Sequence, residues 1–205
     1  MQRTLVIDTA TAACSVALLE GDQVIAAGHD VVGRGHAERL VPMIAALPDG
    51  GRADEILVDV GPGSFTGIRV GIAAARGLAL GWGVPVRGYS STALLAAAAI
   101  ADGVKAPLAV VLEGGHGEVF MQGFTALPLQ PSDPLVSLRP DAAIRALGDR
   151  PAVGSGVRWL LPIDPGLQAH DALPDASRAD LLPASLADLP PRPLYGRAPD
   201  AKLPA

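Results

Sequence analysis

The sequence predicts an α/β protein built from two units in tandem, and three observations support this prediction. In the first half, a short apolar run at residues 55–60 leads directly into a glycine-rich turn and a long helical pattern. The second half repeats apolar runs around a glycine-rich turn at residues 107–124. Between the halves, residues 102–105 (Asp-Gly-Val-Lys) carry the signals that end a helix. We therefore expect an N-terminal domain at residues 1–103 and a smaller C-terminal domain at residues 104–205, whose tail returns to the first.

Five strands are predicted in the first domain. Residues 4–8 and 14–19 are apolar runs separated by polar threonines, as expected for a hairpin. Residues 23–31 follow a Glu-Gly-Asp turn and supply a third strand. The run at residues 55–60 is typical of a buried parallel strand, and residues 84–87 form the last strand of this sheet.

Three helices are predicted between these strands. Residues 36–47 have an apolar face, although Pro42 must kink or start this helix because it cannot donate a hydrogen bond. That face consists of Leu40, Met43, Ile44 and Leu47. The second helix runs from the glycine turn to about residue 81, with Ser64 as its cap. An alanine-rich third helix follows Ser90 or Ser91 and ends near residue 101.

Residues 61–71 (Gly-Pro-Gly-Ser-Phe-Thr-Gly-Ile-Arg-Val-Gly) contain the turn and the start of the second helix. A strand, a tight glycine turn and a helix in succession often present backbone N–H groups to an anion. The P-loop requires a lysine, which this stretch lacks, and Gly67 comes one residue too late for the dinucleotide fingerprint. Neither phosphate loop fits.

Small residues form a stripe along the second helix. At 100° per residue the stripe contains Gly67, Gly71, Ala74, Leu78 and Gly81, and a bulkier stripe beside it contains Ile68, Ile72, Ala75 and Ala79. Glycine within a helix costs about 0.5–1 kcal/mol relative to alanine. Several glycines on one stripe therefore indicate that another backbone approaches closely. It belongs either to this chain's own sheet or to a second chain, and the pattern alone favours the first.

The second domain begins with a predicted hairpin whose turn contains Glu113, Gly114 and Gly115. These glycines could expose the backbone to a phosphate. We expect His116 to be an exposed turn residue. The remaining predicted elements are a strand at 135–138, a helix at 140–147, a strand and turn at 152–156, a loop at 161–175 and a helix at 179–189.

Composition argues against several classes of protein. The net charge is −5 and aromatic residues are few (three Phe, two Trp, two Tyr), which argues against a protein that binds nucleic acid without a partner. Cys14 is the single cysteine, and we expect a small buried hydrophobe there. We find no run of 18 apolar residues and no signal-peptide pattern, so we expect a cytoplasmic location without membrane contact. No catalytic Ser/His/Asp pattern or metal-ligand cluster is evident.

Several segments resemble the TsaB (YeaZ) family, part of the glycoprotease-like (M22-type) branch of the actin/hexokinase/Hsp70 superfamily. Residues 61–71 resemble the family signature, residues 5–17 (LVIDTATAACSVA) its first hairpin and residues 36–44 (HAERLVPMI) its first helix. Residues 193–197 (PLYGR) are similar to the family's tail. The resemblance implies two actin-like (ribonuclease H-like) units, each a mixed sheet flanked by helices, with the second one reduced.

The resemblance also implies a function. Family members are non-catalytic subunits of the bacterial complex that makes threonylcarbamoyladenosine in tRNA. They bind the catalytic paralogue TsaD, which transfers threonylcarbamoyl from threonylcarbamoyl-adenylate to the adenosine next to the anticodon, and they act with a TsaE-type ATPase. They also form homodimers, meet tRNA only through the complex, and require no cofactor. Two alternatives stay open: an ATP-binding phosphotransferase of the sugar-kinase type and an M22-like metallopeptidase.

With this family in view, we expect a second chain to approach the two outer helices. The predicted partner interface is His36, Leu40, Met43, Ile44, Gly67, Ile68, Gly71, Ile72, Ala74, Ala75 and Leu78. We also expect a vestigial nucleotide or phosphate region, at which weak nucleotide binding is possible. It comprises Asp8, Thr9, Gly61, Gly63, Ser64, Glu113, Gly114 and Gly115. At the last three positions the family usually has Asp-Ala-Arg, so a charged contact is lost here.

Two residues are metal candidates by resemblance only. In the superfamily, an aspartate at the end of strand one holds the nucleotide's metal, and Asp8 occupies that place, but Ala10 replaces the glycine that should follow. We expect Asp8 to bond the turn's own N–H groups at least as readily as a metal. The catalytic relatives use two histidines four residues apart, yet Leu40 follows His36 at that spacing. We therefore expect no metal site and a surface or capping role for His36.

Overall fold

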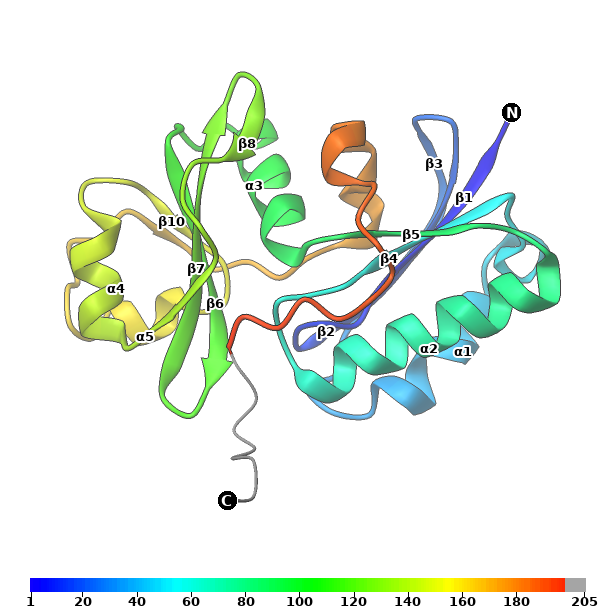
Figure 1. Ribbon diagram of the computed structural model, residues 1–205, viewed down its shortest axis with the longest axis horizontal. Coiled ribbons are helices and arrows are strands. Elements are labelled where there is room, and N and C mark those ends of the chain that lie inside the picture. Colours follow the sequence, from blue (N-terminus) through cyan, green and yellow to red (C-terminus); the bar gives the residue numbers. More distant parts are fainter. Residues whose placement is uncertain (198–205) are drawn as a thin grey trace, which may run out of the picture.

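The computed structural model describes residues 1–197 and contains two mixed β-sheets with helices on their faces (Figure 1). The first sheet has the strand order β3-β2-β1-β4-β5. Its strands are β1 (Arg3–Asp8), β2 (Ala13–Glu20), β3 (Gln23–Val31), β4 (Glu55–Asp59) and β5 (Val86–Tyr89). The β1–β2–β3 meander is antiparallel, whereas β4 and β5 join parallel to β1 through helical crossovers.

The second sheet has the order β11-β10-β6-β7-β8, with β9 paired to β7. Its strands are β6 (Leu108–Gly115), β7 (Glu118–Ala126), β8 (Leu129–Pro131), β9 (Val136–Leu138), β10 (Ala152–Val153) and β11 (Ala169–His170). The hairpin β6–β7 supplies the longest strands, and β10 and β11 are two-residue parallel additions. The predicted fold class is confirmed: two mixed α/β sheets, of which the second is the less regular.

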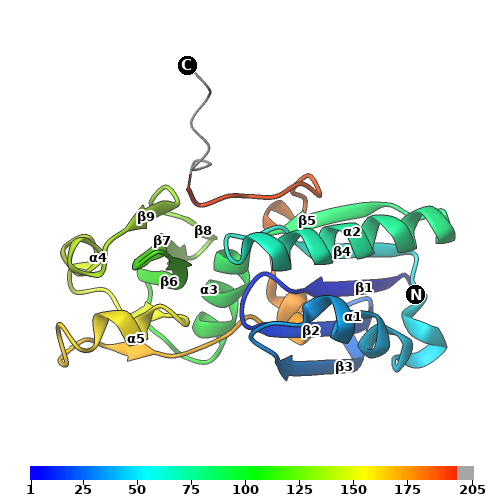
Figure 2. The ribbon, with the colours of Figure 1, turned by 90° about the horizontal axis from the view of Figure 1, so that it is seen from below.

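Helices divide the molecule into layers (Figure 2). The helices α1 (His36–Ala45) and α2 (Phe65–Trp82) cover one face of the first sheet, where Leu40 and Ile68 pack against Ile7 and Val58. The helix α3 (Ser91–Ala101) and the 3₁₀ segment η2 (Ala176–Leu181) lie between the sheets. The helices α4 (Pro140–Leu147) and α5 (Val157–Leu160) cover the outer face of the second sheet.

The layer around α3 belongs to both sheets. Val6 and Leu57 of the first sheet share one buried cluster with Leu108 and Val153 of the second. Eight of the eleven residues of α3 are Ala, Ser or Thr, and these short side chains allow two sheets to approach the helix. The division into domains 1–103 and 104–205 remains a prediction, and residues 198–205 lie outside the described residues.

Most predicted elements match the structure. Ser64 and Ser90 cap α2 and α3 by accepting hydrogen bonds from Gly67 N and Ala93 N, respectively. The predicted helix at 179–189 is wrong: η2 ends at Leu181 and only a second 3₁₀ turn, η3 (Ala184–Leu186), follows. The two prolines at positions 183 and 190 limit helix formation there, because neither has an N–H to donate. A further 3₁₀ turn, η1 (Pro48–Gly51), follows α1.

Residues 189–197, which we call the tail strap, cross from the first sheet to the second (red in Figure 1). Gly88 and Leu189 exchange backbone hydrogen bonds of 2.7 and 2.9 Å. Leu194 N donates to Val60 O at 2.7 Å. At the far end, Arg197 lies 3.6 Å from the Glu118 carboxylate of β7. The tail strap therefore connects β4 and β5 to the β6–β7 hairpin.

Candidate functional site

The signature turn packs directly onto the turn that follows β1. β1 and β4 are parallel neighbours, so their carboxyl ends lie side by side. Ser64 N donates to Ala10 O at 2.6 Å, and a Cβ added at Gly63 would lie 1.9 Å from the same oxygen. Thr9 Oγ1 donates to Gly67 O at 2.7 Å. The glycines of the signature therefore allow this chain's own backbone to come into contact with itself.

Two of the N–H groups at the turn predicted to bind phosphate already have acceptors within this chain. Gly61 N donates to Asp59 Oδ1 at 2.7 Å, and Ser64 N is already used by Ala10 O. Five residues of the predicted phosphate region meet here: Asp8, Thr9, Gly61, Gly63 and Ser64. The other three, Glu113, Gly114 and Gly115, lie at the tip of the β6–β7 hairpin in the other sheet, and no hydrogen bond of residues 1–197 joins them to the first turn. The Glu113 carboxylate pairs with Arg158 instead.

A buried acidic cluster lies beneath this turn. Asp8 and Asp59 are fully buried, and their carboxyl groups hydrogen-bond to each other. Tyr89 O–H donates to Asp8 Oδ2 at 2.9 Å, and Ser91 O–H donates to Asp59 Oδ2 at 2.6 Å. Burial raises the pKa of Asp8, and burial together with the charge of Asp8 raises the pKa of Asp59 well above its usual value. A hydrogen bond between two carboxyl groups requires one proton between them.

Sequence reasoning singled out Asp8 but missed Asp59, Tyr89 and Ser91. A signal for Asp59 was present, because a carboxylate within an otherwise apolar strand must find a partner when it is buried. The expected bond from Asp8 to its own turn exists in a weak form, since Ala10 N lies 3.4 Å from Asp8 Oδ1. Among residues 1–197, no group of three or more His, Cys, Asp or Glu is arranged to hold a metal ion.

The predicted partner-interface residues face inwards. Nine of the eleven are buried in this chain, and the other two, Ala74 and Leu78, are half-buried. A Cβ at Gly67 would lie 2.1 Å from Thr9 O, and one at Gly71 would lie 2.5 Å from Thr9 Oγ1. Assigning Gly67 and Gly71 to contact with a second chain was therefore wrong, because Thr9, the residue that follows β1, occupies the space beside them. The bulkier residues of the list, Leu40, Met43, Ile44, Ile68, Ile72 and Ala75, belong to the core under α1 and α2.

His36 is also buried, contrary to the expected surface or capping role. Its Nε2 lies 2.9 Å from Thr11 O and 3.2 Å from Ala13 O. Carbonyl oxygens only accept, so Nε2 carries the hydrogen, and His36 fixes the start of α1 to the β1–β2 turn. The N-cap position is Gly35. The predictions for Cys14, which is fully buried, and for the exposed turn residue His116 are confirmed.

The outer faces of α1 and α2 form a different surface, which the chain leaves uncovered. Val41 on α1 is 63% exposed, and Leu80 on α2 is 87% exposed. A Cβ added at Gly77 or Gly81 would meet no atom within 4 Å. Ala73 is exposed between them. Small and apolar residues thus also occupy the solvent side of α2, about 80–180° around the helix from Gly71, and they include Gly81 from the predicted stripe.

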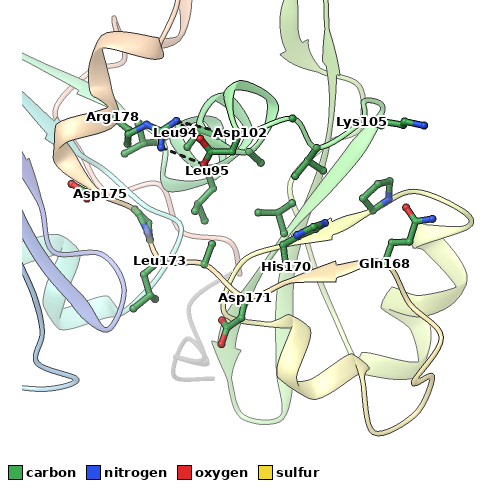
Figure 3. Close-up of a pocket in the computed structure, with 18 residues that line it drawn as sticks. Leu94, Leu95, Asp102, Lys105, Gln168, His170, Asp171, Leu173, Asp175 and Arg178 are labelled. Atoms are coloured by element: carbon green, nitrogen blue, oxygen red, sulfur yellow. Dashed lines mark hydrogen bonds and ion pairs between the residues drawn. The ribbon is translucent and has the colours of Figure 1, made fainter. Parts of the chain in front are cut away.

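A separate pocket of about 620 Å³ opens between α3, the β10–β11 edge and residues 171–178 (Figure 3). Leu94, Leu95 and Val153 form part of its apolar wall. Arg178 pairs with Asp102 at 2.8 Å on one side, and His170 lies on the other (Figure 3). None of the residues predicted to form the partner interface or the phosphate region lines this pocket.

The fold and the signature turn define an α/β protein of the actin-like class, and comparisons with known proteins specify the family. A family model described as "TsaD: tRNA N6-adenosine threonylcarbamoyltransferase" matches residues 30–128. The tRNA threonylcarbamoyladenosine biosynthesis protein TsaB of Escherichia coli is 38% identical over 126 residues, which cover 58% of this chain and 53% of that protein. An uncharacterized protein of Mycobacterium bovis is 32% identical over 97% of this chain and 93% of its own length.

The solved structure "YeaZ from Pseudomonas aeruginosa" superposes with a TM-score of 0.80 at 28% identity, covering 95% of this chain and 100% of that chain. This chain belongs to the TsaB (YeaZ) family. The alignment with E. coli TsaB spans about half the length of that relative. Among the helices described in residues 1–197, none has the length and apolar character needed to cross a membrane.

Proposed function

We propose that this chain is a non-catalytic subunit of a complex that makes threonylcarbamoyladenosine in tRNA. It binds a catalytic TsaD-type paralogue and acts with a TsaE-type ATPase in the cytoplasm. Two relatives named for this biosynthesis, from E. coli and Bacillus subtilis, are 38% and 34% identical to the aligned part of the chain. The match of residues 30–128 to the TsaD family model supports a paralogue of related shape as the partner.

The observation that carries the proposal is the uncovered outer surface of α1 and α2. An exposed apolar surface shared by two neighbouring helices is a candidate protein interface. Val41 and Leu80 supply apolar area, and Gly77 and Gly81 leave room for a partner helix to approach closely. The inward faces of the same helices are already used by the chain's own core.

The polar groups at the signature turn also support a non-catalytic role. At the signature turn, the N–H groups of Gly61 and Ser64 are engaged by Asp59 and Ala10, and the buried acids are satisfied by Tyr89 O–H, Ser91 O–H and each other. Because these N–H, O–H and carboxyl groups already hydrogen-bond to one another, they support a structural role for this turn. We therefore propose that the acyl transfer occurs on the paralogue and that this chain needs no cofactor.

The test is co-purification of this chain with its TsaD paralogue, followed by an assay of tRNA modification with and without it. The interface variant is Val41→Arg/Leu80→Arg, which places two charges on the outer helices. The matched control is Leu127→Arg/Ile163→Arg, because those side chains are 97% and 54% exposed elsewhere. We expect the first variant to lose the paralogue and the modification activity, whereas the control retains both.

Self-association is measured on the same variants. If the wild-type chain does not join the paralogue, the proposed function fails. If the wild type joins it and the double variant joins equally well, only the assignment of the interface to α1 and α2 fails. A homodimer that the double variant abolishes would show that the same surface serves both associations.

A further inference from the structure

A surface of arginines and exposed aromatic rings lies along the tail strap. Phe65 and Tyr195 stack with their ring centroids 5.5 Å apart, and both rings remain exposed, by 57% and 40%. The Arg69 guanidinium lies 3.6 Å above the Phe65 ring and donates to Tyr195 Oη at 3.0 Å. This cluster is formed by the first turns of α2 and the last part of the tail strap.

Four more arginines continue this surface on both sides. Arg76 of α2 donates to Pro191 O at 2.7 Å, and Arg192 is the next residue of the tail strap. At the other end, Arg197 pairs with Glu118, whose carboxylate also feels the charge of Arg139. We call Arg69, Arg76, Arg139, Arg192 and Arg197 the arginine strip. Arg192 and Arg197 belong to the tail strap (red segment in Figure 1), and Arg69 and Arg76 contact the strap from α2. Arg139 joins the strip through its proximity to Glu118.

The partners of these arginines distinguish the strip from the rest of the chain. Elsewhere in residues 1–197, seven of the nine arginines have a carboxylate within 4 Å, and only Arg34 and Arg52 have none among the described ion pairs. In the strip, only Arg197 has such a partner among the described ion pairs. Arg69 and Arg76 are held by a phenol, a ring and a backbone carbonyl, which are uncharged. The strip therefore keeps a local positive charge on a chain whose net charge is −5.

We propose that the arginine strip and the Phe65–Tyr195 stack bind an RNA strand, with the arginines on phosphates and the rings available for an unpaired base. Arginine–phosphate contacts supply affinity for nucleic acid, and stacking on exposed rings suits unpaired bases of any sequence. This inference rests on the proposed function, because it assigns to this chain a direct contact with the tRNA of the complex. Because the strip is short and the chain is acidic overall, we expect the strip to add to tRNA binding by the whole complex and not to bind tRNA strongly by itself.

The test uses Arg139→Gln/Arg192→Gln, since both side chains are exposed and the described contacts give neither a hydrogen-bond partner. The matched control is Arg34→Gln/Arg52→Gln, which removes the same charge from two exposed arginines outside the strip. The probe is an unmodified tRNA transcript that reads codons beginning with A. Its Kd is measured against salt concentration, for the complex with the TsaD paralogue and for the isolated chain.

We expect the strip variant to join the paralogue normally, to bind tRNA several-fold more weakly, and to lower the slope of log K against log salt by about 1 per lost phosphate contact. The control should match the wild type. Equal Kd and slope for strip variant, control and wild type would overturn the proposal. Loss of the paralogue by the strip variant would also overturn it, since the strip would then be a protein contact.

Failure of the proposed function is distinguishable from this outcome. If the wild-type chain does not join the paralogue, that function fails, and the measurement on the isolated chain decides about the strip. A lower salt slope for the isolated strip variant than for the isolated control would support the RNA contact even then. No measurable difference would reject it.

Discussion

The carboxyl groups of Asp8 and Asp59 hydrogen-bond to each other in the interior of the protein. Ile7 pairs with Val58 in the parallel ladder, so the next residues of β1 and β4 lie side by side. Tyr89 and Ser91 donate to the pair from the end of β5 and the start of α3. Four elements, β1, β4, β5 and α3, therefore meet at this buried acid pair.

This pair makes stability depend on pH. Because the pKa values of both carboxyls are raised in the folded state, folded protein binds more protons than unfolded protein above about pH 4. Stability should therefore fall as the pH rises from about 4 through the raised pKa, by up to about 1.4 kcal/mol per pH unit for one proton. We expect Asp59→Asn to flatten this decline and to gain stability relative to the wild type between pH 5 and pH 8.

Urea unfolding at several pH values checks this expectation. The control is Asp149→Asn, which removes an exposed carboxylate that makes no hydrogen bond or ion pair described in residues 1–197 and should leave the slope unchanged. An Asp59→Asn variant with the wild-type slope would show that the pair holds no proton in this range. Asp8→Asn/Asp59→Asn should gain less than the sum of the single changes, because both act on the same proton.

Two glycines of α2 should respond oppositely to alanine. Gly67→Ala places a Cβ 2.1 Å from Thr9 O, and that backbone oxygen cannot move without disturbing the β1 turn. We expect a loss of about 1–3 kcal/mol in the free energy of unfolding. Gly77→Ala meets no atom within 4 Å and should gain about 0.5–1 kcal/mol through helix propensity. Thermal unfolding of the isolated chain measures both, and a Gly67→Ala variant as stable as the wild type would contradict the packing described.

The isolated chain should bind Mg-ATP only weakly. The N–H groups of Gly61 and Ser64 already have acceptors, and the Ala10 carbonyl fills the space beside Gly63. We expect isothermal titration calorimetry to give a Kd of about 1 mM or weaker, a binding free energy of no more than about 4 kcal/mol. Micromolar binding with turnover would instead support the sugar-kinase alternative.

Cys14 should be inert towards alkylation in the folded protein. Its side chain is fully buried, and burial raises the pKa of the thiol to about 11. Only about 0.1% would be thiolate at pH 8. We expect iodoacetamide to react at a rate set by unfolding, and faster in Gly67→Ala than in the wild type. Rapid labelling of both at the rate of a free thiol would mean that β2 opens locally.

The sequence was sufficient to predict most of the fold. Alternating and apolar runs gave the strands of both sheets, because burial of one or both faces leaves a clear pattern. Caps such as Ser64 and Ser90 gave helix starts. The strands β8 and β11 were missed, since two or three residues carry no periodicity. The proline-rich region after residue 181 was misread as helix.

The site was harder to predict, for a physical reason that α2 illustrates. Helical spacing shows which residues share a face, but it does not show which chain covers that face. Gly71 and Gly77 look alike in the sequence, yet one packs against Thr9 and the other faces solvent. The acid pair could have been inferred: Asp8 and Asp59 each end an apolar run, and neighbouring parallel strands bring such ends together.

The tail strap has a consequence for the order of assembly during synthesis. Residues 189–197 follow every strand of both sheets along the chain, so they leave the ribosome after all the segments that they connect. Both sheets can therefore form before the tail strap, which joins them, has been synthesised. A nascent chain arrested before residue 189 would therefore have its halves joined only through the α3 layer, and protease should cut it more readily than the released protein.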